Sequence, residues 1–141
     1  MIKYIYYRIC KDWERKQKLN KTLWSNPPYA WLYSFMSFLF MPFAFLGGTL
    51  MDSDNKWTGS VASGFILLWA IYFFSHQFEK RMKNYTPSEQ YKRFDKIPLF
   101  CFTGPLFLLM ILWCFGGILL MSFYVIEPFN LNGWLYNHLF P

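Results

Sequence analysis

Residues 97–126 read IPLFCFTGPLFLLMILWCFGGILLMSFYVI, and no residue in this stretch carries a charge. A helix that crosses the ~30 Å hydrocarbon core of a bilayer needs about 20 apolar residues in succession. Soluble domains spread charge over their surface, and about 25% of their residues are charged. Here the charged fraction is 16%, and long stretches hold none of it. The stretch therefore predicts a transmembrane helix over about residues 98–126.

Two more apolar runs precede this one, at about residues 31–51 and 57–76, and neither contains Lys, Arg, Asp or Glu. The runs are apolar on every side, whereas the strands of a membrane barrel alternate apolar and polar residues. A helix satisfies all of its own backbone hydrogen bonds in hydrocarbon. The sequence therefore predicts an all-α integral membrane protein with three transmembrane helices. The short connection near residues 52–56 predicts that the first two form an antiparallel hairpin.

The basic residues are distributed unevenly between the polar segments. Segment 1–28 holds seven Lys and Arg residues, and the loop 77–97 holds six. The first connection holds only Lys56, and the tail 127–141 holds none. Lys and Arg accumulate on the cytoplasmic side of transmembrane helices. This alternation predicts a cytoplasmic N-terminus and an outside C-terminus, most simply in a bacterial inner (cytoplasmic) membrane.

The N-terminal segment has the periodicity of an amphipathic helix over residues 1–24. One face is apolar and carries Ile2, Ile5, Tyr6, Ile9 and Trp13. A basic helix with such a face lies in the membrane surface. The alternative is that it packs against the second cytoplasmic segment, and the two arrangements are compatible.

The net charge of +6 indicates an anionic binding partner. Because the basic residues flank the apolar runs, the expected partner is anionic lipid headgroups. Nucleic acid is not expected, because no DNA- or RNA-binding motif accompanies the charge. The cations predicted to lie at the membrane surface are Lys3, Arg8, Lys11, Arg15, Lys80, Arg81, Lys92 and Arg93.

The second cytoplasmic segment contains a helix-start pattern. Thr86 is a typical N-cap residue, and proline, here Pro87, is common at the first helical position. Glu89 is the acidic residue that would complete a capping box with Thr86. The pattern predicts a helix that starts at Pro87 and continues toward the third apolar run. Pro98 and Pro105 are expected to kink it.

Small residues mark the expected helix contacts. Without a hydrophobic driving force in lipid, helices associate where small side chains let their backbones approach. The predicted packing positions are Gly47, Gly48, Gly59, Ser60, Ser63, Gly64, Gly116 and Gly117. They serve contacts either within the three-helix bundle or with a second copy or another protein. Trp69 and Trp113, deep in their runs, each need an acceptor for the indole N–H.

The sequence holds no motif for enzyme chemistry. Its three Cys residues form no Cys-x-x-Cys pair, and no nucleotide loop or nucleophile motif occurs. The two His residues, His76 and His138, fall on opposite sides in the predicted topology. We therefore expect no catalytic residues, no cofactor and no metal.

Three hypotheses for function remain. The leading one is a non-enzymatic subunit or scaffold that binds other membrane proteins through its glycine-bearing helices and basic surface. The second is a membrane effector or its neutraliser, namely a small oligomeric pore or a toxin-immunity protein. A transporter of a small solute is weaker, because the runs hold no ionisable residue at membrane depth.

Overall fold

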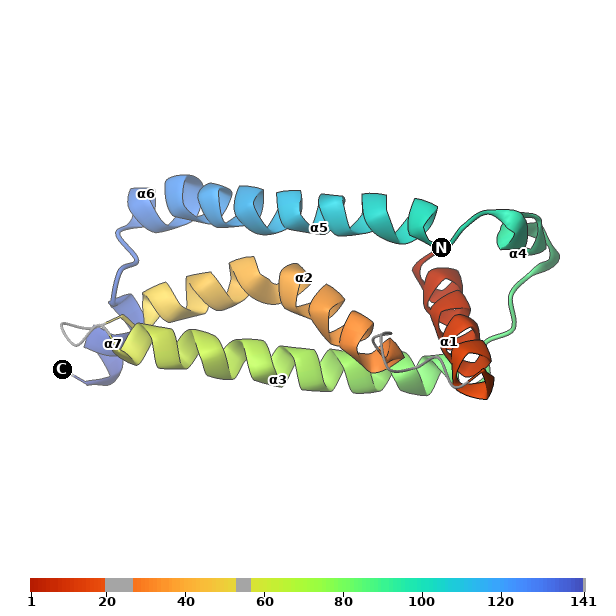
Figure 1. Cartoon of the computed structure of the whole chain (residues 1–141). Helices are drawn as coiled ribbons and strands as arrows, with labels where there is room; N and C mark the ends of the chain where they lie inside the picture. The colour runs from red at the N-terminus through yellow and green to blue at the C-terminus, as the bar shows by residue number, and fades with distance from the viewer. Residues whose placement is uncertain (20–26, 53–56, 141) are drawn as a thin grey trace.

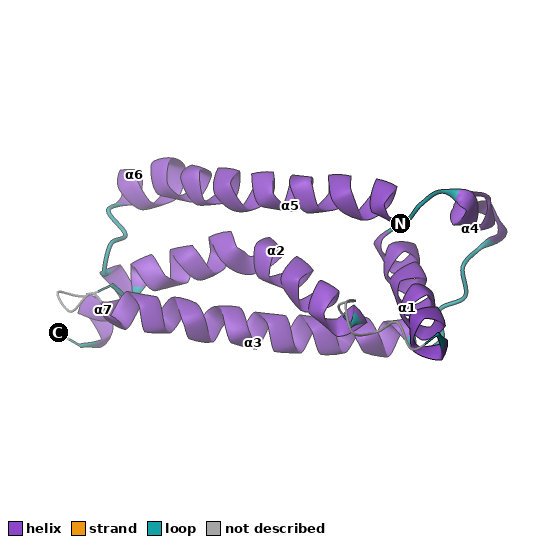
Figure 2. Cartoon of the chain, viewed as in Figure 1, coloured by secondary structure: helices purple, strands orange, loops and turns teal. Residues whose placement is uncertain are grey.

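Helices make up all of the regular structure of the described residues. The structure is a computed structural model that describes residues 1–19, 27–52 and 57–140, and no strand occurs within these ranges (Figure 2). The elements are α1 (Ile2–Lys18), α2 (Pro28–Leu50), α3 (Trp57–Met82), α4 (Glu89–Lys92), a 3-10 turn η2 (Arg93–Lys96), α5 (Phe100–Met121), a π-helical turn η3 (Ser122–Ile126), α6 (Glu127–Phe129) and α7 (Trp134–Leu139).

Three of these helices are long and apolar enough to cross a membrane, as predicted. They are α2, α3 and the continuous stretch Phe100–Phe129, in which α5, η3 and α6 follow one another. The second is longer than expected, because the helix continues past His76 to Met82. The N-terminal helix ends at Lys18 with Leu19 as its C-cap, and residues 20–24 of its predicted range lie outside the described residues.

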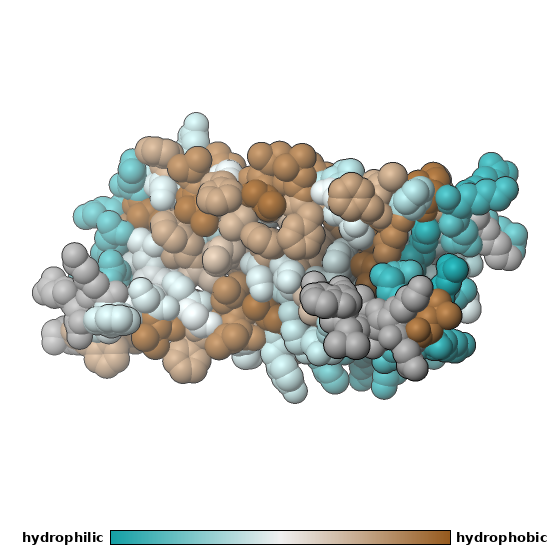
Figure 3. Space-filling view, in the orientation of Figure 1, coloured by the Kyte–Doolittle hydropathy of each residue, from teal (hydrophilic) through white to brown (hydrophobic). Residues whose placement is uncertain are grey.

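The three long helices lie side by side in a flat arrangement with α2 in the middle (Figure 1). α2 contacts α3 along one side, which confirms the predicted hairpin, and α5 along the other. α1 lies across one end of the long helices, beside the segment that contains α4, and α7 lies at the opposite end. Hydrophilic residues gather toward both ends and apolar ones dominate the middle (Figure 3).

Prolines shape the long helices differently from the prediction. Pro98 precedes α5, so it marks the end of the polar connection and kinks no helix. Pro105 lies inside α5, and Pro42 lies inside α2. A proline within a helix removes one backbone donor and crowds the preceding turn. α2 changes direction in its middle part (Figure 1), as an internal proline such as Pro42 would cause.

The predicted helix start at Thr86–Pro87 is wrong. α4 begins at Glu89 with Ser88 at its N-cap, makes no side-chain cap hydrogen bond and gives way to η2 after one turn. The predicted continuation toward the third apolar run also fails, because Pro98 has no N–H to donate to the carbonyl of Phe94. Ile97 donates to that carbonyl instead, at 3.1 Å, and the segment closes as a 3-10 turn.

Candidate functional site

The backbones of α2 and α3 touch where small residues face one another. A Cβ atom added to Gly59 would lie 2.8 Å from the carbonyl oxygen of Gly48, and one on Gly48 would lie 2.7 Å from that of Gly59. Ser63 adjoins the same point and donates its hydroxyl to the Gly59 carbonyl at 3.0 Å. A side chain on Gly47 would meet Ile66. These four small residues therefore serve contacts within the bundle.

The remaining small residues lie elsewhere. Added Cβ atoms on Gly64 and Gly116 would meet nothing within 4 Å among the described residues. Ser60, one turn from Gly64 on α3, is exposed. The four small residues of α3 therefore form two pairs, each with a spacing of four residues: Gly59 and Ser63 face α2, whereas Ser60 and Gly64 face outward.

α5 meets α2 at the internal proline. A Cβ on Gly117 would lie 2.7 Å from the Cγ of Pro42, so glycine is needed for the close approach. Trp113 donates its indole N–H to the carbonyl of Leu39 at 3.1 Å, one turn before the proline. This contact supplies the acceptor that the sequence required for Trp113. Neither the contact of Gly117 with Pro42 nor that of Trp113 with Leu39 was predicted from the sequence.

The C-terminal tail folds back onto the end of α2. The N–H of Gly133 donates to the carbonyl of Thr49 at 2.9 Å. Gly133 has φ 66°, and a Cβ there would lie 2.6 Å from the carbonyl oxygen of Asp52. A left-handed backbone at such a close approach strongly favours glycine.

At the other end of the bundle, α1 is docked against the second polar segment. The hydroxyl of buried Tyr4 donates to Asp95 Oδ1 at 2.7 Å, and its ring stacks on that of Tyr91 with centroids 5.0 Å apart. Tyr6 is also buried, and its ring packs edge-on against that of Phe78 in α3. Of the two predicted arrangements of α1, the structure therefore shows the one in which the helix packs against the second polar segment.

Arg8 holds this docking in place. Its Nη1 donates to the carbonyl of Phe94 at 2.9 Å, and its Nη2 donates to those of Asp95 at 3.3 Å and Ile97 at 2.8 Å. The guanidinium carbon also lies 5.8 Å from the ring centroid of Phe102. A planar guanidinium with several fixed donors suits such a cluster of carbonyls. The sequence placed Arg8 at the membrane surface, and nothing in it indicated this contact.

The surroundings of Tyr4 keep its hydroxyl group protonated. Burial first, and then the hydrogen bond to Asp95, raise the pKa of Tyr4 to about 12. The phenol therefore keeps its proton, and remains the donor to Asp95, even at a pH above the ordinary pKa of tyrosine.

The other predicted surface cations surround this end of the molecule. Lys11 lies with its Nζ 4.7 Å from the ring centroid of Tyr7, and Lys92 belongs to α4. The side chains that stay exposed are those of Lys3, Lys11, Arg15, Lys80, Arg81 and Arg93. Their contact with lipid headgroups stays a prediction.

The described residues include no group of three or more His, Cys, Asp and Glu side chains that could hold a metal ion. The expectation that the chain needs no metal, cofactor or catalytic residue stays a prediction.

The fold defines a class: an all-helical protein with three helices long and apolar enough to span a membrane. No known family, curated protein or solved structure matches the chain.

Proposed function

We propose that α2, α3 and Phe100–Phe129 cross a bilayer, with α1 and α4 on the cytoplasmic side of a bacterial inner membrane. The apolar middle of the molecule and its hydrophilic ends support this placement (Figure 3). The basic residues support the direction, because thirteen of the fourteen lie in segments 1–28 and 77–97. α1 lies across the ends of the long helices (Figure 1), as a helix in the plane of a membrane surface would.

This topology predicts which single cysteines react from which side. With Cys10, Cys101 and Cys114 replaced by Ser, a cysteine at Asn84 should react with an impermeant maleimide only after the cytoplasmic side is opened. A cysteine at Asn137 should react in intact cells. Labelling of both positions from the same side would contradict the three-span arrangement.

Within that membrane, the chain acts as a non-enzymatic subunit or scaffold that binds another membrane protein. The observation that carries the proposal is the outward face of α3, which presents Ser60 and Gly64. Gly64 has no neighbour within 4 Å among the described residues. α2 is the long helix that α3 contacts closely. A glycine such as Gly64 on an outward-facing side of a helix allows a partner helix to approach closely.

The test compares two outward glycines. We expect Gly64→Leu to reduce co-purification of a partner membrane protein by roughly tenfold after gentle extraction, because the added side chain separates the backbones. Gly116→Leu on α5 is the matched comparison, since that glycine also has no neighbour within 4 Å among the described residues, and an equal loss in both variants would show that the effect is not specific to the α3 face. Native mass spectrometry of the extracted protein identifies what is bound.

Each outcome separates the hypotheses. A hetero-complex sensitive to Gly64→Leu supports the subunit role. A homo-oligomer of fixed number would favour the pore, with Ser60 among the candidates to line it. Equal binding by both variants and the native chain would contradict a role for this face.

A further inference from the structure

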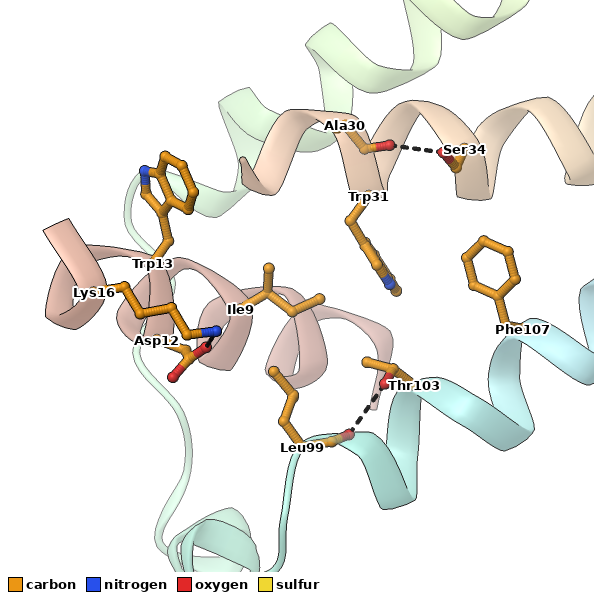
Figure 4. A pocket seen from close by; sticks show the side chains of 10 residues that line it. All are labelled: Ile9, Asp12, Trp13, Lys16, Ala30, Trp31, Ser34, Leu99, Thr103 and Phe107. Carbon is orange, nitrogen blue, oxygen red and sulfur yellow. Dashed lines mark hydrogen bonds and ion pairs between the residues drawn. The ribbon is translucent and has the colours of Figure 1, made fainter. Parts of the chain in front are cut away.

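A pocket of about 440 Å³ opens at the polar end of the bundle, between α1, the first turn of α2 and the start of α5. This volume falls in the range of small-ligand sites. Figure 4 shows the indole of Trp31 projecting from α2 into it, with Phe107 of α5 across from it. Asp12 and Lys16 of α1 lie on another side of the pocket (Figure 4).

The interior of the pocket offers a donor without an acceptor. Trp31 Nε1 is buried and has no hydrogen-bond partner among the described residues. Such a donor is costly to leave unmet, so its position favours a ligand that brings an oxygen acceptor. Ser34 and Thr103 also line the pocket and donate their hydroxyls to helix carbonyls one turn back, to Ala30 at 2.9 Å and to Leu99 at 3.3 Å. Their oxygens keep lone pairs for a ligand donor.

Two opposite charges also line the pocket. Lys16 Nζ and Asp12 Oδ2 are 2.6 Å apart, and each side chain remains more than 40% exposed at 42% and 43%. An exposed ion pair one turn apart on a helix is weak. Both groups can therefore exchange their contact for one with a ligand that carries the two opposite charges.

We propose that this pocket binds the headgroup of a phospholipid that carries a primary amine, of the phosphoethanolamine type. The phosphate oxygens accept from Lys16 Nζ and from Trp31 Nε1, and the ammonium group donates to Asp12. The glycerol and first acyl carbons lie against Phe107. Charge-assisted hydrogen bonds of this kind are strong and short. A quaternary ammonium has no N–H for Asp12, and an anionic headgroup leaves Asp12 without a cation.

This inference rests on the proposed membrane placement, which puts the polar end at headgroup depth. The pocket lies beyond the apolar middle of the molecule, where phosphate and amine groups are found in a bilayer. Free glycerophosphoethanolamine has the same chemistry as the lipid headgroup. The experiment therefore includes it as a separate ligand.

The test is native mass spectrometry of the full chain in detergent with an equimolar mixture of phosphatidylethanolamine, phosphatidylcholine and phosphatidylglycerol of the same acyl chains. We expect preferential retention of phosphatidylethanolamine. Lys16→Gln and Trp31→Phe should each lower that retention by roughly tenfold, and Asp12→Asn should remove the preference over phosphatidylcholine. The matched controls are Lys18→Gln, on the same helix, and Trp57→Phe, at the opposite end of the bundle.

Equal retention of the three lipids, or the same loss in Lys18→Gln as in Lys16→Gln, would overturn the proposal. If glycerophosphoethanolamine displaces the lipid at equal concentration, the ligand of the pocket is the free headgroup compound and not a lipid. Alkaline extraction of membranes separates the two proposals, because release of the native chain would reject the membrane placement itself. Retention of the chain together with indiscriminate lipid binding would reject the pocket alone.

Discussion

Replacement of Gly48 by Ala is expected to lower the free energy of unfolding by about 1–3 kcal/mol, the usual cost of overpacking a close contact. The new methyl group would meet Ser63 and lie 2.7 Å from the carbonyl oxygen of Gly59. A serine side chain can rotate away, but the backbone oxygen moves only if α2 and α3 separate. The helix preference of Ala, worth up to about 1 kcal/mol over Gly, offsets part of the cost.

The measurement is unfolding of the purified protein in mixed micelles with increasing sodium dodecyl sulphate, followed by circular dichroism. Gly116→Ala is the control, because it brings the same helix preference and its methyl group meets no other described residue within 4 Å. We expect that control to be neutral or slightly stabilised. Two variants of equal stability would show that α2 and α3 do not touch at Gly48.

Replacement of Arg8 by Gln is expected to release α1 from the polar end without unfolding the three long helices. The variant loses donors to three carbonyls, those of Phe94, Asp95 and Ile97. Hydrogen bonds from a charged donor contribute about 1.5–3 kcal/mol each when buried. These are exposed, so we expect a total of about 1–3 kcal/mol. Amide hydrogen exchange in α1 should then become roughly tenfold faster.

Arg8→Lys distinguishes this contact from a general attraction to lipid. Lysine keeps the charge and has three donors, but they sit on a single nitrogen, so it cannot reproduce the geometry in which two guanidinium nitrogens reach the carbonyls from separate positions. We expect its exchange rates to resemble those of Arg8→Gln. If Arg8→Lys exchanges as slowly as the native chain, charge alone holds α1, and the carbonyl contacts contribute little.

The sequence predicted the long helices well because their signal is local. Each apolar run contains its own evidence, and the short connection near residues 52–56 leaves α2 and α3 no arrangement but a hairpin. Gly59 and Ser63 could be named as packing residues from their spacing. Which of the two interleaved pairs faces α2 could not be named, because a uniformly apolar helix has no polar face to orient it.

The contacts that the sequence did not reveal join residues far apart in the chain. Gly117 packs on Pro42, and Trp113 donates to Leu39, but neither pair is visible without knowing that α5 lies beside α2. The helix start at Thr86 failed for a related reason. A capping pattern describes local preference only, whereas this segment also contacts α1, which is far away in the chain.

The docking of α1 also has a consequence for the order of biosynthesis. Tyr4 bonds to Asp95, 91 residues later in the chain. At about 5–20 residues per second, the ribosome adds those residues in roughly 5–18 s. During that interval α1, which is basic and amphipathic, lacks its partner Asp95. The docked position of α1 is therefore completed only after α2 and α3 have been made, because Asp95 follows both in the chain.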